Sequence, residues 1–108
     1  MVKTRQEIEN VISRYRRALS ALGITAEQVI LFGSYATGKA REISDIDLLI
    51  VSSDFRGKNI RERLELLGVG AVRIMEPIQA YGLTPEEVTS EEKSSFVKAI
   101  LEEGRIAA

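Results

Sequence analysis

The residues best suited to chemistry lie in one run of sequence, VILFGSYATGKAREISDIDLLIV, between Val29 and Val51. A short apolar segment ends there at Gly33 and Ser34, and a second one opens with Asp45 and Asp47. A glycine at a turn lets an anion approach the backbone because no Cβ stands in the way, and nearby amides and hydroxyls can donate to that anion. Two acids spaced two apart on a strand share one face. The run therefore predicts a phosphate-binding turn beside a pair of carboxylates.

Each half of this pattern also has a plain structural explanation. Gly33-Ser34 fits an ordinary turn, and Asp45 and Asp47 fit the exposed start of a strand where both acids are solvated. If the acids are close and buried, however, their repulsion is costly, and a divalent cation relieves it. Two such ions can activate an attacking oxygen and stabilise a leaving phosphate. Taken separately, the two motifs leave both interpretations open.

The absence of two residue types narrows the possible chemistry. The 108 residues include no cysteine and no histidine. Disulfides, thiolate nucleophiles, zinc clusters and serine–histidine–aspartate triads are therefore excluded. Acid–base work falls to carboxylates, lysine or tyrosine, and a metal site must be rich in oxygen, which favours Mg²⁺ or Mn²⁺.

Composition predicts a single ordinary globular domain over residues 1–108. Hydrophobic residues make up 44% and charged residues 29%, and the net charge of −1 provides no general attraction for nucleic acid. No apolar run approaches the ~20 residues of a membrane span, and the sequence MVKTRQEIEN is too polar for a signal peptide. We therefore expect a cytoplasmic protein that neither enters membranes nor binds nucleic acid by itself.

The elements that position the motifs follow from apolar spacing and from helix-capping residues. We expect, in chain order, a helix over Arg5–Leu22, a strand over Val29–Phe32, a short helix over Ser34–Ala40, a strand over Asp45–Val51, a short helix through Ile60, Leu64 and Leu67 that closes at Gly68 and Gly70, a strand over Ala71–Gln79, and a last helix that carries Phe96, Val97, Ile100 and Leu101. Pro77 interrupts the third strand and predicts either an edge strand or a strand end. Thr84 and Thr89 each cap a helix start. The alternation predicts an α/β domain with a small mixed sheet flanked by helices.

A second phosphate-binding motif begins at the same glycine. The residues from Gly33 to Lys39 follow the pattern G-x-x-x-x-G-K, which is close to the P-loop. The next residue is Ala40, where a P-loop has the serine or threonine that binds Mg²⁺, and Asp45 follows too soon for the long P-loop helix. The P-loop interpretation is therefore disfavoured, and Lys39 is either a phosphate contact or an exposed loop cation.

The combined string G-S-x-A-x-G and S-D-I-D-L-L-I-V resembles the signature of the polymerase-β-like nucleotidyltransferases, in particular their minimal nucleotidyltransferase (MNT) branch. The resemblance implies that Gly33 and Ser34 hold the triphosphate of ATP, and that Asp45 and Asp47 bind the Mg²⁺ or Mn²⁺ ions. It also implies a third carboxylate on a later strand that helps to deprotonate the acceptor. The residue in that place is Glu76, within RIMEPIQAYGLTPEEV, where the family more often has aspartate; a surface acid before a proline is the alternative.

The resemblance further implies an activity and a partner. Members of the family transfer a nucleoside monophosphate, here AMP from ATP, to a hydroxyl group and release pyrophosphate. Minimal members work beside a separate helical HEPN protein as the antitoxin of a toxin–antitoxin pair, and some modify a tyrosine of that partner. The alternative is a catalytically weak binding module that neutralises a HEPN ribonuclease by complex formation, or a nucleotide sensor without transfer. A homodimer is also possible.

Overall fold

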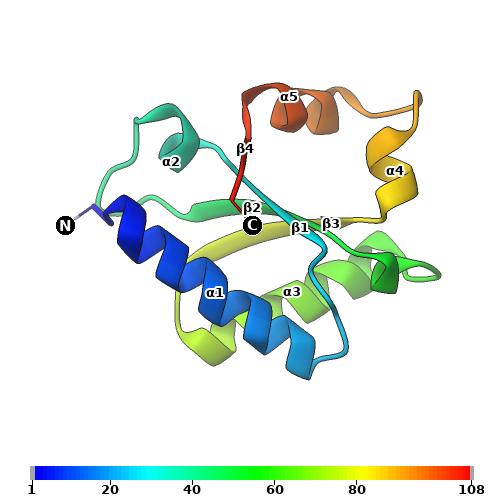
Figure 1. Ribbon diagram of the computed structural model, residues 1–108, viewed down its shortest axis with the longest axis horizontal. Helices are drawn as coiled ribbons and strands as arrows, with labels where there is room; N and C mark the ends of the chain where they lie inside the picture. Colours follow the sequence, from blue (N-terminus) through cyan, green and yellow to red (C-terminus); the bar gives the residue numbers. More distant parts are fainter. Residues whose placement is uncertain (1, 108) are drawn as a thin grey trace.

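The computed structural model describes residues 2–107 and contains a four-stranded sheet between helices (Figure 1). The elements in chain order are α1 (Arg5–Ala21), β1 (Gln28–Phe32), α2 (Ser34–Thr37), β2 (Ile46–Val51), the 3-10 helix η1 (Ser53–Phe55), α3 (Ile60–Ile74), β3 (Ile78–Leu83), α4 (Pro85–Thr89), α5 (Ser95–Glu103) and β4 (Arg105–Ile106). The strand order is β3-β2-β1-β4. β2 and β3 are parallel, whereas β1 is antiparallel to β2 and to β4. The predicted small mixed sheet is confirmed.

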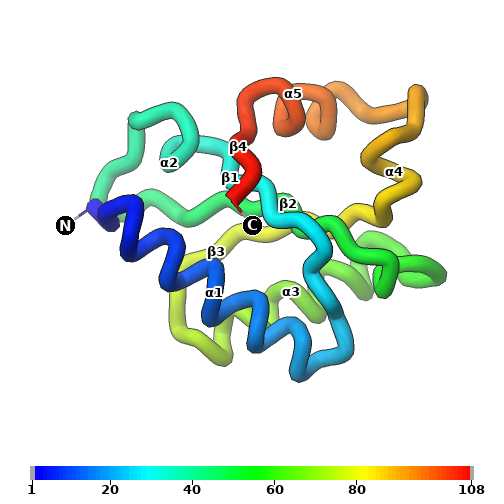
Figure 2. The backbone as a smooth tube through the Cα atoms, in the orientation of Figure 1, coloured from blue at the N-terminus to red at the C-terminus, as the bar shows by residue number. Residues whose placement is uncertain are grey.

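The main core lies between one face of the sheet and the helices α1 and α3, which run side by side in Figures 1 and 2. Alternate residues of β2 point into it, so that Ile46, Leu48 and Ile50 are almost fully buried. The hydroxyl of Tyr15 in α1 donates to the carbonyl of Leu67 in α3 at 2.7 Å. This bond satisfies the polar end of a buried ring, which a core side chain requires.

The opposite face of the sheet is covered by α5. Ile100 packs there on Ile30, Phe32 and Leu49. The rings of Tyr81 and Phe96 lie edge to face with their centroids 5.1 Å apart. Strand residues alternate between the two faces, so Asp47, two residues before Leu49 in β2, lies on this same face. The position of Asp47 follows from the same register that buries its neighbours.

The expected end of the third helix is wrong. We expected Gly68 and Gly70 to close it and a strand to begin at Ala71, but α3 continues to Ile74 and β3 begins only at Ile78. Gly70 is a packing residue, since a Cβ there would lie 3.0–3.1 Å from the side chains of Leu19 and Tyr15. The helix ends instead at Met75, which has a left-handed conformation. Pro77 does precede an edge strand, as expected.

The C-terminal third differs from the expectation in two places. Thr84 caps α4 with a full capping box, as expected, but the last helix begins after Ser94 and not after Thr89, which is the last residue of α4. The short strand β4 was not predicted. It pairs Arg105 with Leu31 and Ile106 with Ile30, and so attaches the end of the described chain to β1.

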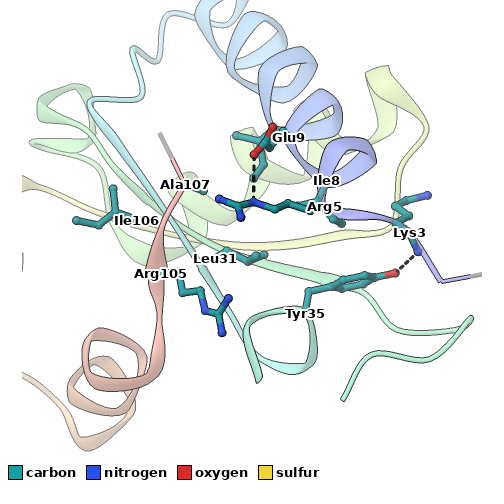
Figure 3. Close-up of a pocket in the computed structure, with 10 residues that line it drawn as sticks. Lys3, Arg5, Ile8, Glu9, Leu31, Tyr35, Arg105, Ile106 and Ala107 are labelled. Carbon is teal, nitrogen blue, oxygen red and sulfur yellow. Dashed lines mark hydrogen bonds and ion pairs between the residues drawn. The ribbon is translucent and has the colours of Figure 1, made fainter. Parts of the chain in front are cut away.

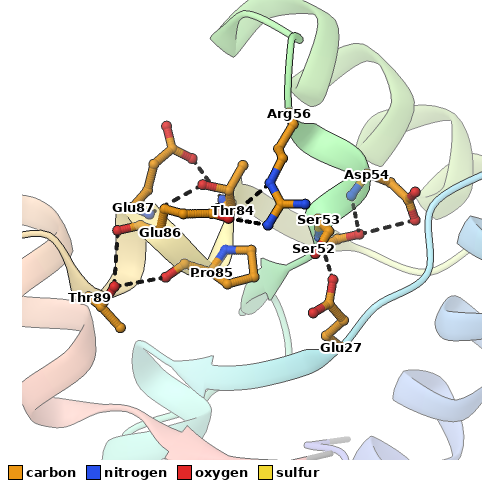
Figure 4. Close-up of polar contacts among 10 residues, drawn as sticks. All are labelled: Glu27, Ser52, Ser53, Asp54, Arg56, Thr84, Pro85, Glu86, Glu87 and Thr89. Carbon is orange, nitrogen blue, oxygen red and sulfur yellow. Dashed lines mark hydrogen bonds and ion pairs between the residues drawn. The ribbon is translucent and has the colours of Figure 1, made fainter.

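A cluster of polar contacts closes the end of the sheet at which β2 finishes (Figure 4). Arg56 forms an ion pair with Glu86 of α4, Ser52 caps η1, and the amide of Ser53 donates to Glu27. This cluster lies at the opposite end of β2 from Asp45 and Asp47, and its polar groups satisfy one another, which indicates a structural role. No helix of the described residues 2–107 is both long and apolar enough to span a bilayer.

Candidate nucleotide and metal site

The turn between β1 and α2 depends on a glycine. Gly33 has φ 70° and ψ −152°, a conformation that is essentially restricted to glycine. Its carbonyl accepts hydrogen bonds from the amides of Ala36 and Thr37 at 3.0 and 3.1 Å. The turn therefore has a fixed shape, with its carbonyl directed into α2.

Several donors of this turn are unused. Within residues 2–107, no acceptor lies on the hydroxyl of Ser34 or on the amides of Ser34 and Tyr35. Unpaired donors that converge at a turn are the usual means of binding an anion through the backbone. The predicted role of Gly33 and Ser34 in phosphate binding has the donors that it needs.

Asp47 lies against this turn. In the sheet register it is paired with Phe32 of β1 on one side and with Gln79 of β3 on the other. A Cβ on Gly33 would overlap the Oδ2 atom of Asp47, so the carboxylate occupies the space that any other residue at position 33 would fill. The acid of the second motif and the glycine of the first are therefore in direct contact.

The pKa of Asp47 is raised, first because the carboxyl is half-buried and then because of the negative charges of Asp45 and Glu103. Asp45 is exposed and precedes β2 directly. Negative charges that lie close together repel one another at an energetic cost, which a bound cation offsets. Asp45, Asp47 and Glu103 thus bring negative charge together beside the Gly33 turn.

Glu103, at the end of α5, was not among the predicted site residues. Its Oε1 atom accepts a hydrogen bond from the Gly33 amide at 3.1 Å, although the two residues are 70 positions apart. No local motif marks this glutamate in the sequence. Only the docking of α5 and the pairing of β4 with β1 bring it to the turn.

Glu76, the expected third carboxylate, is in a different environment. One of its oxygens lies 2.5 Å from Nη2 of Arg14 and the other 3.3 Å from Nζ of Lys3. Both cations belong to the α1 side of the sheet, whereas Asp47 faces α5. Burial raises the pKa of Glu76, but the hydrogen bonds and charges of Arg14 and Lys3 outweigh it and lower the pKa overall. In this structure Glu76 forms an ion pair with Arg14 and Lys3, and its catalytic and metal-binding role stays a prediction.

The strand position beside Asp47 carries an amide. Gln79 is the β3 partner of Asp47, and its side chain lies 3.5 Å from the hydroxyl of Tyr81. Lys39 stays close to the turn because its amide donates to the carbonyl of Ser34 at 2.9 Å, and its side chain is exposed. The structure thus brings together Gly33, Ser34 and Asp47, with Asp45 at the margin, and leaves Lys39 within the loop.

These residues fit a magnesium ion that is bound together with a nucleotide. Among residues 2–107 there is no group of three or more acids that could hold a metal without other ligands. Mg²⁺ commonly uses one or two carboxylates, several waters and the phosphates of a substrate. Asp45 and Asp47 supply such a pair beside a turn with free donors, so the donor set suits Mg²⁺ or Mn²⁺ only when phosphates complete it.

A separate cavity of about 330 Å³ lies between α1 and the β1–β4 edge (Figure 3). Leu31, Tyr35 and Ile8 line it, and the Tyr35 hydroxyl accepts a hydrogen bond from the Lys3 amide at 3.3 Å. The ring of Tyr35 packs against the main core, on the α1 side of the sheet. This cavity is on the opposite face from Asp47.

Two named relatives match most of this chain in sequence. Two proteins of Methanocaldococcus jannaschii, each named "Putative protein adenylyltransferase", match it. The first is 28% identical over 94 residues, which is 86% of this chain and 61% of the relative. The second is 29% identical over 106 residues, 97% of this chain and 98% of the relative. The chain thus spans only 61% of the length of one relative and nearly all of the other.

Two solved structures share the fold. One is titled "Crystal structure of the toxin-antitoxin with AMP-PNP", with a TM-score of 0.60, 22% identity, and 93% of this chain and 72% of that chain covered. The other is titled "Crystal structure of a putative nucleotidyltransferase from Sulfolobus solfataricus at 1.40 A resolution", with a TM-score of 0.57, 22% identity, and 98% of this chain and 89% of that chain covered. The polymerase-β-like fold that the sequence predicted is confirmed.

The family model described as "Nucleotidyltransferase domain" matches residues 12–107, which include the Gly33 turn, both aspartates and Glu103. This match extends over almost the whole described chain and agrees with the fold. The chain therefore belongs to the nucleotidyltransferase domain family.

Proposed function

We propose that this nucleotidyltransferase moves AMP from ATP to a hydroxyl group of a partner protein, in a reaction that requires Mg²⁺. The observation that carries the proposal is the contact between Asp47 and Gly33, where the carboxylate fills the space of an absent Cβ. Because of this contact, the phosphate-binding turn and the metal-binding acid form one site. An ATP molecule placed in it would have its phosphates beside both groups.

In the proposed reaction, each residue has a defined role. The donors of Gly33 and Ser34 bind the β- and γ-phosphates, and Asp45 and Asp47 hold the ion. When bound, Mg²⁺ supplies positive charge that offsets the charge on the phosphates. The acceptor oxygen bonds to the α-phosphorus, the bond to the bridging oxygen breaks, pyrophosphate leaves, and the acceptor proton passes to water. Positioning and charge neutralisation are most of what such a reaction requires.

The acceptor is proposed to lie on another protein. The described residues form a small sheet that α1 and α3 cover on one face and α5 on the other, and they supply no second lobe for an acceptor. The names of the M. jannaschii relatives and the toxin–antitoxin title of one structural neighbour support a protein acceptor. We propose a helical HEPN protein as that partner, with this chain as the antitoxin and a tyrosine hydroxyl as the group modified.

A specific observation supports the second candidate, a catalytically weak module that neutralises a HEPN ribonuclease by binding. Gln79 occupies the strand position beside Asp47, and both oxygens of Glu76 are engaged by Arg14 and Lys3. Neither residue provides a third carboxylate to accept the proton of the acceptor. In this second candidate, nucleotide binding remains and transfer is slow or absent.

The two candidates differ in one measurement. The purified protein is incubated with ATP labelled in its α-phosphate, Mg²⁺ and the protein encoded by the neighbouring gene. Transfer of label to the partner, together with its loss in Asp47→Asn, supports the enzyme. A tight complex without label, equally tight with Asp47→Asn, supports the binding module. If neither label transfer nor a complex is found, both candidates are rejected for that partner.

A further inference from the structure

We propose that Glu103 is an internal competitor for nucleotide phosphate, which occupies the Gly33 amide when ATP is absent and is displaced when ATP binds. This inference rests on the proposed function, because it takes the Gly33 turn to be the phosphate site. It adds a regulatory residue that lies outside both sequence motifs.

The contact itself has the chemistry of a bound anion. The Gly33 amide donates to Oε1 of Glu103 at 3.1 Å. A carboxylate oxygen and a phosphate oxygen are both anionic acceptors that prefer backbone N–H groups. Within residues 2–107, the amides of Ser34 and Tyr35 have no acceptor, whereas the Gly33 amide has one, and that acceptor is a negatively charged side chain. Glu103 is thus placed where a phosphate oxygen would be expected.

The backbone of Glu103 is held firmly on both sides. Ile100, one turn earlier in α5, is buried against Ile30 and Phe32. Gly104 follows, and its amide donates to the carbonyl of Ile100 at 2.7 Å. A Cβ on Gly104 would lie 2.5 Å from Cγ2 of Ile30, so the chain passes directly over β1. The carboxylate is therefore delivered to the turn by a fixed backbone and not by a loose tail.

The side chain itself is free to leave. Glu103 is exposed, and its one hydrogen bond in the described structure is the one to Gly33. Rotation about its side-chain bonds would clear the turn without moving α5 or β4. It would have to rotate on ATP binding, because two anions cannot use the same amide and because Glu103 already adds its negative charge to the field around Asp47.

Competition of this kind lowers the apparent affinity by the fraction of molecules in which the site is free. The affected ligands are those whose phosphates reach the turn, which are the β- and γ-phosphates in the proposed binding mode. The competition should therefore lower the apparent affinity for ATP, whereas the affinity for AMP, which lacks both phosphates, should be unaffected. This difference separates displacement of Glu103 from a general effect of charge.

The test compares Glu103→Ala with Glu102→Ala, the neighbouring exposed glutamate of α5, which forms no hydrogen bond or ion pair within residues 2–107. Binding of ATP and of AMP, each with Mg²⁺, is measured by calorimetry, and thermal unfolding confirms that each variant is folded. We expect Glu103→Ala to bind ATP about five- to tenfold more tightly, which corresponds to ~1–1.4 kcal/mol. Its affinity for AMP should be unchanged, and Glu102→Ala should match the parent protein for both ligands.

Each other outcome has a definite meaning. If the parent binds ATP and Glu103→Ala binds it no better, the competition is refuted and the proposed function stands. Weaker ATP binding by Glu103→Ala would assign Glu103 to holding the nucleotide, and would also refute it. An equal gain in affinity for AMP, or an equal gain in ATP affinity in Glu102→Ala, would show that the loss of one negative charge explains the effect. Either result would reject the displacement of Glu103. If no variant binds ATP, the proposed function fails and this inference fails with it.

Discussion

Gly33 is the residue whose replacement should affect the site most directly. A side chain there would both adopt a forbidden backbone conformation and overlap Oδ2 of Asp47. We expect Gly33→Ala to lower the free energy of unfolding by about 1–3 kcal/mol and to abolish ATP binding, because Asp47 must move. Chemical denaturation and ATP titration measure the two effects.

The chain offers a matched control for this substitution. Gly38 has a similar φ of 76°, but no atom lies within 4 Å of a Cβ added to it. Gly38→Ala should therefore cost about 1 kcal/mol of stability and leave ATP binding close to that of the parent. Equal losses of binding in both variants would show that backbone strain, and not the contact with Asp47, explains the effect.

We expect Asp47 to lower the stability of the fold and to be required for nucleotide transfer. Its pKa is raised by burial and by the charges of Asp45 and Glu103, so the folded state favours the protonated form more than the unfolded state does. The destabilisation is absent below the ordinary pKa of an aspartate and grows as the pH rises through that value towards the raised one. We expect Asp47→Asn to reduce nucleotide transfer at least a hundredfold, about 2.7 kcal/mol, yet to unfold at a higher temperature than the parent at pH 7. A lower unfolding temperature at pH 7 would contradict this account of Asp47.

At the scale of elements, Glu76 joins α1 to the connection between α3 and β3. Its carboxylate is only 17% exposed and is held by Arg14 and Lys3. We expect Glu76→Gln to lower the free energy of unfolding by about 1–2 kcal/mol at pH 7 and to leave nucleotide transfer intact. Denaturation and the labelled-ATP assay measure the two effects.

The pH dependence of that loss follows from the lowered pKa of Glu76. A carboxyl whose pKa is lowered on folding stabilises the protein fully above its ordinary pKa, and the contribution disappears as the pH falls through the lowered value. The difference between parent and Glu76→Gln should therefore shrink below about pH 4. The control is Glu65→Gln, because the ion pair of Glu65 with Arg61 is exposed and should contribute less than ~0.5 kcal/mol. Loss of transfer in Glu76→Gln would restore Glu76 to the active site.

The elements that sequence could predict are those with a strong local pattern. The helix start at Arg5, the apolar strands around Gly33 and the capped start at Thr84 all appear where expected. The extension of α3 was missed because Gly70 resembles a helix end in sequence, whereas its small size actually allows α1 to approach. That requirement is visible only once the helices are packed.

The residues of the candidate site were likewise predictable only where they belong to a local motif. Gly33, Ser34, Asp45 and Asp47 lie in one short run, and local geometry is enough to bring them together. The ion pair of Glu76 was not foreseen because it depends on where α3 ends, and Glu103 was missed because its contact with Gly33 depends on the docking of the last helix. Long-range contacts of this kind leave no spacing rule in a single sequence.

At the scale of the whole molecule, the two faces of the sheet have different tasks. Helices α1 and α3 bury one face, and it holds most of the large buried side chains. The other face is covered by the short helix α5, whose own Phe96 remains 51% exposed. Asp47 lies on this less covered face, so ligands reach it without opening the main core. Binding should therefore add to the stability of the fold without reorganising it.

The final prediction concerns how that added stability depends on the metal. Two carboxylates and a turn are an incomplete site for either ligand alone, since Mg²⁺ lacks its phosphate ligands and ATP lacks the charge that offsets the acids. We expect Mg²⁺ alone, or ATP with excess EDTA, to leave the unfolding temperature almost unchanged. Together they should stabilise the protein by about 2.7 kcal/mol when ATP is 100-fold above its Kd, a rise of several degrees in a scanning-fluorescence experiment. Asp47→Asn should lose this rise and Glu65→Gln should keep it. An equal rise with ATP in EDTA would mean that the acids do not bind the ion, and would overturn the metal assignment of Asp45 and Asp47.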